Sequence, residues 1–482
     1  MTGIAFKSAN ELAAMIRGKE IGCAELLDLY LARMERYNPA LNAIVATDMP
    51  RAKTRAAAAD AALAKHQSWG PLHGVPMTVK DSHRVAGMPT SWGEPALKDN
   101  IASSDGLTVQ RWLNAGVTLF GKTNIPRQLS DLQSWNEIYG TTNNPWDLTK
   151  TPGGSSGGAA AAVAAGLTAI EMGSDIASSI RNPAHFCNLY GHKPTWGICP
   201  SLGHGPFENY SITDISCVGP IARSAGDLET GLTIMAGPDE IDAQGYRLEL
   251  PPSRRQEIDA FKIALMDDHP LAPVDDEVRT LLHELADWLG RQGAVVDDDA
   301  GPEFDIEDAA RTYNLMVSAV MNGRAEDRTF AANLERANAA AGKSGVVAEM
   351  QRGAVLYHRE WLLLNEKRHR MRWQWHEFFK TYDVMLCPVV CTAAFEHDPV
   401  PPLERLKTIN GERYPAMTDI FWAGISGLFY LPASVAPIGF TKTGLPVGVQ
   451  IIAPQYNDRT AIQFAKLLES GYHAFTPPPG FD

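Results

Sequence analysis

The chain has 482 residues, of which 45% are hydrophobic and 21% charged, a composition typical of a folded globular protein and not of a disordered one. Its 43 basic and 56 acidic side chains leave a formal net charge of −13, which disfavours a nucleic acid as a partner. The longest apolar stretch, about a dozen residues, is too short to span a bilayer, so no membrane partner is expected.

The beginning of the chain lacks the basic and then apolar layout of a secretory signal peptide, so we expect a cytoplasmic protein. Six scattered cysteines suit reduced thiols better than a disulfide framework. Cys387 and Cys391 are the one close pair, and His397 and Asp398 downstream make them a loose candidate for a metal site. Buried apolar thiols are the favoured interpretation of this pair.

Helical patterns come first along the chain. Ser8 and Glu11 stand at the spacing of a capping box, and apolar residues follow on one helical face. A second helical pattern begins at Ala24 and is expected to end before Asn38, because Pro39 follows. These helices are expected to form an outer layer.

Further along, short β-branched runs alternate with helical patterns, which predicts a mixed or parallel sheet covered by helices. A helix with four leucines between two such runs predicts a further strand-helix-strand unit. The expected strands lie in 75–79, 117–124, 167–175, 261–268, 294–299, 382–390 and 445–454. The leucines are Leu281, Leu282, Leu285 and Leu289, and the strongly helical segment 305–380 has an apolar face with Trp361, Leu364, Met371, Trp375 and Phe378.

These patterns predict an α/β fold, with one large domain over residues 1–482 whose mixed sheet is covered by helices on both faces. No internal repeat or linker divides the chain. The expected parts are peripheral helices over 1–68, a core with the chemical motifs over 70–230, a variable helix-rich region with substrate loops over 231–420, and closing strands with a C-terminal helix over 421–482.

The stretch TPGGSSGGAAAAVAAG, from Thr151 to Gly166, places two serines inside four glycines. A phosphate loop would need a lysine and a hydroxyl after its last glycine, but alanines follow Gly158. The pattern G-x-S-x-G also suggests the nucleophile elbow of an α/β-hydrolase, but an Asn- and Pro-rich loop precedes it where a strand is needed. From this stretch alone, a glycine turn that caps a helix explains the sequence as well as a catalytic loop does.

Other motifs around this loop change the balance. The loop is followed by Gly173-Ser174-Asp175 and by Ser179-Ile180-Arg181, and it is preceded by GVPMTVKD, which ends with Lys80 and Asp81. In this order, the motifs resemble the amidase signature family, and YDVMLCP and GLPVGVQIIAP extend the resemblance over most of the chain. The resemblance implies a hydrolase of amide C–N bonds that uses no metal and no organic cofactor.

The same resemblance implies a catalytic triad. It makes Ser179 the nucleophile, Ser155 the bridging serine after a cis peptide bond, and Lys80 the base. A lysine is a base only when neutral, which burial achieves by lowering its pKa. Taken without the other motifs, Lys80 would be interpreted as a surface lysine. His185 and His192 are rival bases that we interpret as structural.

The segment just before the nucleophile departs from the family pattern, because Ala177 and Ser178 stand where the family usually has two glycines. Two added Cβ atoms narrow the conformations of this loop, which leaves activity expected but its rate open. The resemblance implies an oxyanion hole made by the backbone N–H groups of Ile176, Ala177, Ser178 and Ser179, with Asp175 and Arg181 as supports of the loop. It also implies a pocket wall that includes Leu129, Ser130, Asp131, Gln133 and Trp135.

The expected substrate is a small amide, with an aryl or apolar group favoured by aromatic segments such as FENY and FWAGISGLFYL, and with carbamates and esters as alternatives. Two other hypotheses stay open: a component of an amidotransferase complex, and a binding protein that has lost activity. A monomer or a homodimer is expected.

Overall fold

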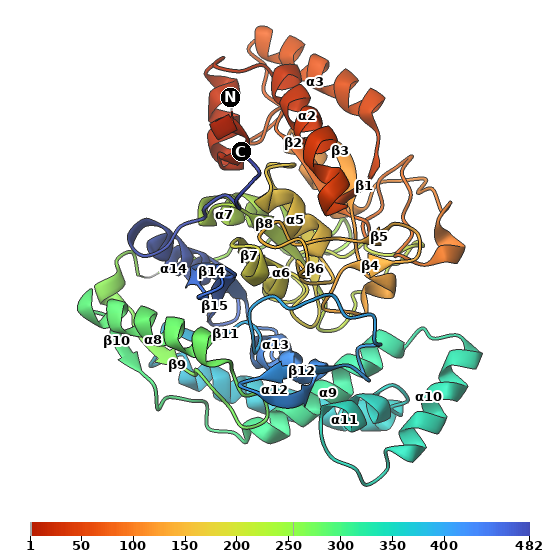
Figure 1. Cartoon of the computed structure of the whole chain (residues 1–482), viewed down its shortest axis with the longest axis vertical. Coiled ribbons are helices and arrows are strands. Elements are labelled where there is room, and N and C mark those ends of the chain that lie inside the picture. Colours follow the sequence, from red (N-terminus) through yellow and green to blue (C-terminus); the bar gives the residue numbers. More distant parts are fainter. Residues whose placement is uncertain (1, 254) are drawn as a thin grey trace.

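An eight-stranded mixed sheet forms the centre of the computed structural model, which describes residues 2–253 and 255–482 (Figure 1). The strand order is β10-β9-β11-β15-β14-β7-β8-β6. Strand β9 is parallel to β10 and β11, and the other five neighbouring pairs are antiparallel. The strands are β6 (Glu171–Asp175), β7 (Tyr190–Lys193), β8 (Cys217–Ala222), β9 (Lys262–Leu265), β10 (Val295–Asp297), β11 (Val384–Pro388), β14 (Ala433–Phe440) and β15 (Pro446–Ile452).

A second sheet has three strands in the order β1-β3-β2. Strand β2 (Pro76–Lys80) is parallel to β3 (Thr118–Thr123), and β1 (Ile44–Thr47) is antiparallel to β3. The end of β2 reaches the large sheet at its edge strand β6, because the side chain of Lys80 contacts Ser174 there. The last residue of β2 therefore lies where the two sheets meet.

The N-terminal helices lie on the outside of the small sheet (Figure 1). They are α1 (Ala9–Arg17), α2 (Cys23–Leu41) and α3 (Met49–Ala64). The expected capping box is confirmed, since Ser8 Oγ accepts the N–H of Glu11 at 3.1 Å and the Glu11 carboxylate accepts the N–H of Ser8 at 2.8 Å. This reciprocal pair satisfies two backbone donors that the start of α1 would otherwise leave free.

The end of α2 differs from the sequence expectation. The helix continues through Pro39 to Leu41, so the expected end before Asn38 is wrong. The helix stops at Asn42, whose φ of 51° turns the chain out of the helix. The side-chain oxygen of Asn38 accepts two N–H groups of the following segment, at 2.8 and 2.9 Å, and so stabilises a last turn that contains a proline.

The alanine-rich segment forms α5 (Gly157–Ala164), and all eight of its residues are buried. It approaches the small sheet closely, since a Cβ atom at Gly158 would fall 2.4 Å from the backbone nitrogen of Asn124. The other helices around this part of the chain are α4 (Leu107–Asn114), α6 (Arg181–Phe186), α7 (Ala225–Met235) and α14 (Asp458–Gly471).

The second half of the chain confirms the expected strand-helix-strand unit. Helix α8 (Asp276–Arg291) joins the parallel strands β9 and β10 and buries Leu282, Leu285 and Leu289. The helical segment after β10 buries Met371, Trp375 and Phe378, which confirms its apolar face. Its helices are α9 (Ile306–Asn322), α10 (Asp327–Ala339), α11 (Val346–Gly353) and α12 (His358–Phe378), followed by α13 (Ile420–Gly427). Two short hairpins complete the fold, β4 (Trp135–Asn136) with β5 (Gly140–Thr141) and β12 (Leu406–Ile409) with β13 (Glu412–Pro415).

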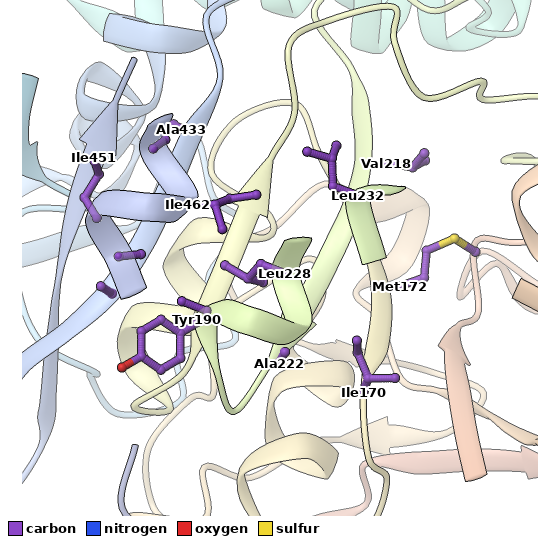
Figure 2. Packing of buried hydrophobic residues seen from close by; sticks show 14 of the residues in the cluster. Ile170, Met172, Tyr190, Val218, Ala222, Leu228, Leu232, Ala433, Ile451 and Ile462 are labelled. Carbon is purple, nitrogen blue, oxygen red and sulfur yellow. The ribbon is translucent and has the colours of Figure 1, made fainter. Parts of the chain in front are cut away.

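The whole arrangement is the expected single α/β domain, a large mixed sheet flanked by helices (Figure 1). Among the helices of residues 2–253 and 255–482, none contains an apolar stretch of the length that a bilayer-spanning helix needs. Figure 2 shows the packing between the sheet and the helices that cover it, with Leu228 and Leu232 of α7 near Ile462 of α14.

Truncation of this core is expected to destabilise the protein. Leu228 is fully buried, so Leu228→Ala should lower the free energy of unfolding by about 2–5 kcal/mol, because the surrounding helices only partly fill the cavity. Leu362→Ala on α12 is a matched control, since this leucine is 49% exposed and its loss should cost about 0.5 kcal/mol or less. Urea unfolding of both variants measures the difference, and equal losses would contradict the assignment of this core.

Candidate active site

Lys80 is the centre of the candidate site. It is the last residue of β2, a strand with every residue buried, and its own side chain is fully buried. Its amine Nζ lies 2.7 Å from Ser155 Oγ, 2.8 Å from Ser156 Oγ and 3.0 Å from Ser174 Oγ. The structure therefore places the predicted base in direct contact with the predicted bridging serine, and it excludes the alternative of a surface lysine.

The environment of Lys80 favours the neutral amine. Burial lowers its pKa from the ordinary value to about 7, while the negative charges of Asp175 and Glu171 act in the opposite direction. Burial also raises the pKa of Glu171 to about 8, although the hydroxyls of Thr78 and Thr123 donate to this carboxyl at 2.9 and 2.8 Å. Burial thus shifts the balance of Lys80 from the ammonium toward the neutral amine.

Glu171 is a residue of the site that the sequence motifs did not indicate. It lies in the segment LTAIEMGSD, whose pattern predicts only an apolar strand. The signal that it offers is a charged residue in the middle of that strand, because a carboxyl group on a buried strand needs hydrogen-bonding partners.

The loop before α5 brings Ser155 to Lys80. The peptide bond between Gly154 and Ser155 is cis, as the family resemblance implies, and Gly153 has a φ of +91°, a conformation that favours glycine. A Cβ atom at Gly154 would fall 2.2 Å from the carbonyl oxygen of Gln133, so no other residue fits there. The glycines are thus required by close backbone contacts around the site.

Ser156 occupies the N-cap position of α5, but its hydroxyl does not cap the helix. Instead its Oγ lies near the Lys80 amine and donates to the carbonyl oxygen of Ser174 at 3.3 Å. The helix-capping alternative for the glycine loop therefore explains the position of this serine but not the partners of its side chain.

Ser179 lies in the turn between β6 and α6 and is 4% exposed. Its carbonyl oxygen accepts the N–H of Ser156 at 3.2 Å, which joins the turn to the glycine loop. Within residues 2–253 and 255–482, the Ser179 hydroxyl has no hydrogen-bond partner, and it is not among the fully enclosed polar atoms. The hydroxyl is therefore free of hydrogen bonds within the described residues, including any to the predicted bridging Ser155.

Asp175 and Arg181 support this turn as a buried ion pair, with 2.8 Å between Arg181 Nη2 and Asp175 Oδ1. The Asp175 carboxylate also accepts the N–H groups of Ser178 at 2.9 Å and Ile180 at 3.0 Å. Burial alone would raise the pKa of Asp175, but the Arg181 charge and these hydrogen bonds hold it at about 2. The pair is buried and not a surface ion pair, and its hydrogen bonds to the turn are those that a supporting role would require.

The expected set of four oxyanion donors needs one correction. The N–H of Ser178 is engaged by Asp175, so it is not free for a substrate. The N–H groups of Ile176, Ala177 and Ser179 have no acceptor among the described residues, and these three remain as candidates. Ser178 has a φ of +81°, and its buried hydroxyl has no partner in the described part of the chain. Such a backbone favours glycine, the residue that the family usually has there.

The residues expected in the pocket wall divide into two groups. The side chains of Asp131 and Gln133 are engaged within the protein, since Asp131 pairs with Arg405 at 2.7 and 2.8 Å and Gln133 bonds the backbone of Asp398. Their contribution next to the glycine loop comes from their backbone carbonyls. A cavity of about 780 Å³ borders Asp131 and Arg405, but Lys80, Ser155 and Ser179 do not line it.

Leu129, Ser130 and Trp135 form the second group and are more accessible. Trp135 is 37% exposed, and Ser130 is exposed with its hydroxyl donating to the carbonyl of Gln128. Leu129 has a φ of +58° and is half-buried. None of the three contacts Lys80, Ser155 or Ser179 through a hydrogen bond in the described residues.

The rival histidine bases have other partners. His185 contacts the backbone of Gly448 and Thr392, and burial lowers its pKa to about 4. His192 lies 2.9 Å from Ser434 and 3.1 Å from Asp458. Neither ring is bonded to Ser179, as the structural interpretation of both residues requires.

The cysteine pair does not form a metal centre. Cys387 and Cys391 are buried free thiols, and the amide of Gln450 donates to Cys387 Sγ at 3.2 Å. Across the described residues, no group of three or more histidine, cysteine or acidic side chains could hold a metal ion. His397 instead contacts Asn143 at 3.1 Å.

Comparison with known proteins agrees with this geometry. The pattern of a family described as Amidase matches residues 25–462. The chain belongs to the amidase family. It is 33% identical over 473 residues to an indoleacetamide hydrolase of Bradyrhizobium diazoefficiens, covering 96% of this chain and 86% of that one. It is 30% identical to an acylamidase of Rhodococcus erythropolis, covering 96% of this amidase and 95% of the relative.

Another relative represents the amidotransferases. A glutamyl-tRNA(Gln) amidotransferase subunit from Methylococcus capsulatus is 30% identical over 502 residues, covering 98% of each chain. Among solved structures, a bacterial aryl acylamidase of the amidase signature family superposes with a TM-score of 0.80 at 24% identity over 96% of both chains. A 6-aminohexanoate cyclic dimer hydrolase gives a TM-score of 0.79 at 25% identity, over 99% of this amidase and 100% of the other chain. These structures confirm the fold class.

Ser178→Gly is expected to stabilise this amidase by about 1 kcal/mol. The substitution removes a left-handed backbone cost of roughly 1–2 kcal/mol and a buried hydroxyl without a partner, against roughly 0.5–1 kcal/mol for the greater freedom of glycine in the unfolded chain. Ala177→Gly is the control, because Ala177 has no left-handed φ and its replacement should destabilise. Thermal unfolding compares them, and a loss of stability in Ser178→Gly would refute the argument.

Proposed function

We propose that this chain hydrolyses the C–N bond of small linear amides through an acyl-enzyme on Ser179. The observation that carries the proposal is the buried Lys80 amine in contact with Ser155 and Ser156, next to a turn in which the Ser179 carbonyl accepts the N–H of Ser156. Amide hydrolysis needs an activated nucleophile, a proton carrier and donors for the oxyanion, and candidates for all three converge here.

The proposed reaction begins when Ser179 Oγ attacks the amide carbonyl, while its proton passes through Ser155 to the neutral Lys80. The carbonyl oxygen becomes an oxyanion that the N–H groups around Ala177 stabilise. The tetrahedral intermediate then breaks its C–N bond, and Lys80 returns the proton through Ser155 to the leaving nitrogen. Water, which loses its proton along the same path, attacks the ester and releases the acid and free Ser179.

Names of relatives support the substrate class. Indoleacetamide hydrolase, acylamidase and aryl acylamidase are among the proteins that this chain resembles. We place aryl or apolar amides first among substrates, and carbamates and esters with the same groups second. The segment FENY contributes less than expected, since Phe207 is 62% and Tyr210 80% exposed, whereas α13 and Phe429 are buried.

The similarity to an amidotransferase component supports a second candidate function, in which the chain acts within a complex. The two candidates differ in what the purified chain does alone. Hydrolysis of simple anilides without partner proteins or ATP supports the amidase, and strict dependence on both supports the amidotransferase. We further propose a monomer or homodimer in the cytoplasm, where the six buried free thiols, all within the described residues, stay reduced.

Ser179 is expected to be the residue that reacts covalently. An aryl or alkyl fluorophosphonate should label the wild-type chain once, with the modified peptide containing Ser179, and Ser179→Ala should abolish both labelling and hydrolysis. Ser470→Ala on α14 is the control and should keep both. A folded wild-type chain that shows no labelling would support the inactive binding protein instead.

The rate is expected to rise with pH through the pKa of Lys80. The base must be neutral, and its pKa is lowered to about 7, so kcat/KM should fall about tenfold for each pH unit below 7 and level off above it. A pH series of anilide hydrolysis measures this profile. A maximum at acid pH would count against Lys80 as the base.

A further inference from the structure

Tyr313 connects a distant helix to the turn that holds the candidate oxyanion donors. It lies on α9 and is 1% exposed. Its hydroxyl donates a hydrogen bond to the carbonyl oxygen of Ile176 at 2.8 Å. Ile176 comes directly after β6, between Asp175 and Ser179, so this contact reaches the turn from outside it.

The contact with Tyr313 also fixes the direction of the neighbouring backbone N–H. The carbonyl of Ile176 and the N–H of Ala177 belong to one peptide group, which is planar and not among the cis bonds of the described residues. In a trans peptide the two groups point in opposite directions, so a partner that fixes the carbonyl also fixes the N–H. The Ala177 N–H has no acceptor in the described chain and points away from Tyr313.

We propose that Tyr313 is a positioning residue for the oxyanion hole, which orients the Ala177 N–H by holding the Ile176 carbonyl. This inference rests on the proposed hydrolysis at Ser179. A hydrogen bond to the carbonyl also polarises its peptide group and strengthens the N–H as a donor. Tyr313 therefore acts on the reaction through the backbone, without touching the substrate.

The surroundings of Tyr313 hold its ring in one place. A Cβ atom at Gly424 of α13 would fall 2.7 Å from the Tyr313 ring, so glycine at this position makes room for it. Phe421, Ile425 and Phe429 line the same small apolar cavity as the ring. Since burial raises the pKa of Tyr313, the hydroxyl keeps its proton and remains a donor.

The neighbouring charges are already engaged by other groups. Arg181 and Asp175, the charged residues that act on Tyr313, pair with each other at 2.8 Å. Arg181 also donates to the Ser426 hydroxyl at 2.9 Å and to the carbonyl of Ala423 at 3.1 Å, both on α13. Asp175 thus fixes the N–H of Ser178 on one side of the turn, and Tyr313 fixes the carbonyl of Ile176 on the other.

Tyr313→Phe tests the inference, because it removes the hydroxyl and keeps the ring. The control is Tyr30→Phe, since Tyr30 is also fully buried and donates to a backbone carbonyl, that of Ala5, at 3.1 Å. Fluorophosphonate titration measures the concentration of active sites. Dividing the rate by this concentration gives a kcat for the folded protein alone. We expect kcat of Tyr313→Phe to fall about 10- to 100-fold with KM changed less than twofold, and Tyr30→Phe to keep both.

An arylboronic acid supplies the readout that a purely structural role would not move. Ser179 Oγ adds to boron and passes its proton to the lysine relay, and a boron hydroxyl takes the place of the oxyanion. Affinity for the boronate should fall by the same factor as kcat in Tyr313→Phe, while affinity for a non-reactive substrate-like amide stays unchanged. Unchanged boronate affinity and kcat in Tyr313→Phe would overturn the inference.

A second variant keeps the test decisive if Tyr313→Phe folds poorly. Gly424→Ala retains the hydroxyl but pushes the ring, and it should lower kcat and boronate affinity together. Normal values for both would contradict the positioning role. A wild-type chain that neither hydrolyses amides nor binds the boronate would overturn the proposed function itself, and this outcome differs from an active wild type with an unaffected Tyr313 variant.

Discussion

A buried amine without a carboxylate partner is the constraint on which the site depends. Three other lysines of the described residues are buried. Lys122 lies 3.1 Å from Asp81 and Lys407 lies 2.8 Å from Asp419, whereas Lys193 contacts the carbonyl of Pro194 and the thiol of Cys217. Lys80 is equally buried, but in the described residues it contacts only hydroxyl and carbonyl oxygens of serines. A hydroxyl can form a hydrogen bond with an amine in either charge state. The direct contacts of Lys80 therefore do not require the charged form, and burial favours the neutral one.

The fold gives the nearest acidic side chains partners of their own. Asp175 is paired with Arg181 and backbone N–H groups, and the Glu171 carboxyl accepts from Thr78 and Thr123. Both acidic residues belong to β6, the edge strand that meets the end of β2. The junction of the two sheets thus brings the candidate base, its serines and the turn of Ser179 together, while each nearby acidic side chain has hydrogen-bonding partners other than the amine.

Local sequence signals predicted the parts of the fold that local interactions determine. The Ser8 capping box, the strand ending at Lys80 and the leucines of α8 are examples, because each depends on residues a few positions apart. The predicted end of α2 before Asn38 was wrong, because the side chain of Asn38 supports a last turn that contains Pro39. Strands β7, β8 and β14 were not predicted. The pairing of β7 with β14 joins segments far apart in the chain, but β14 also forms a hairpin with the neighbouring strand β15, which a local reading could have found.

The candidate site shows the same division. Short motifs predicted Lys80, Ser155 and Ser179, whose spacing along the sequence carries the family resemblance. Tyr313 has no such signal, because it contacts a residue 137 positions away. The engagement of the Ser178 N–H by Asp175 depends on the turn geometry, which a list of residue types does not contain.

Titration of the Lys80 amine itself decides whether the site holds a neutral base. Lysine labelled with ¹³C at Cε reports the protonation of each side chain by NMR, and the Lys80 signal is the one missing from Lys80→Met. We expect this signal to titrate near pH 7, where burial places its pKa. Titration near pH 10, as for an exposed lysine, would contradict the claim that a neutral buried amine drives the chemistry.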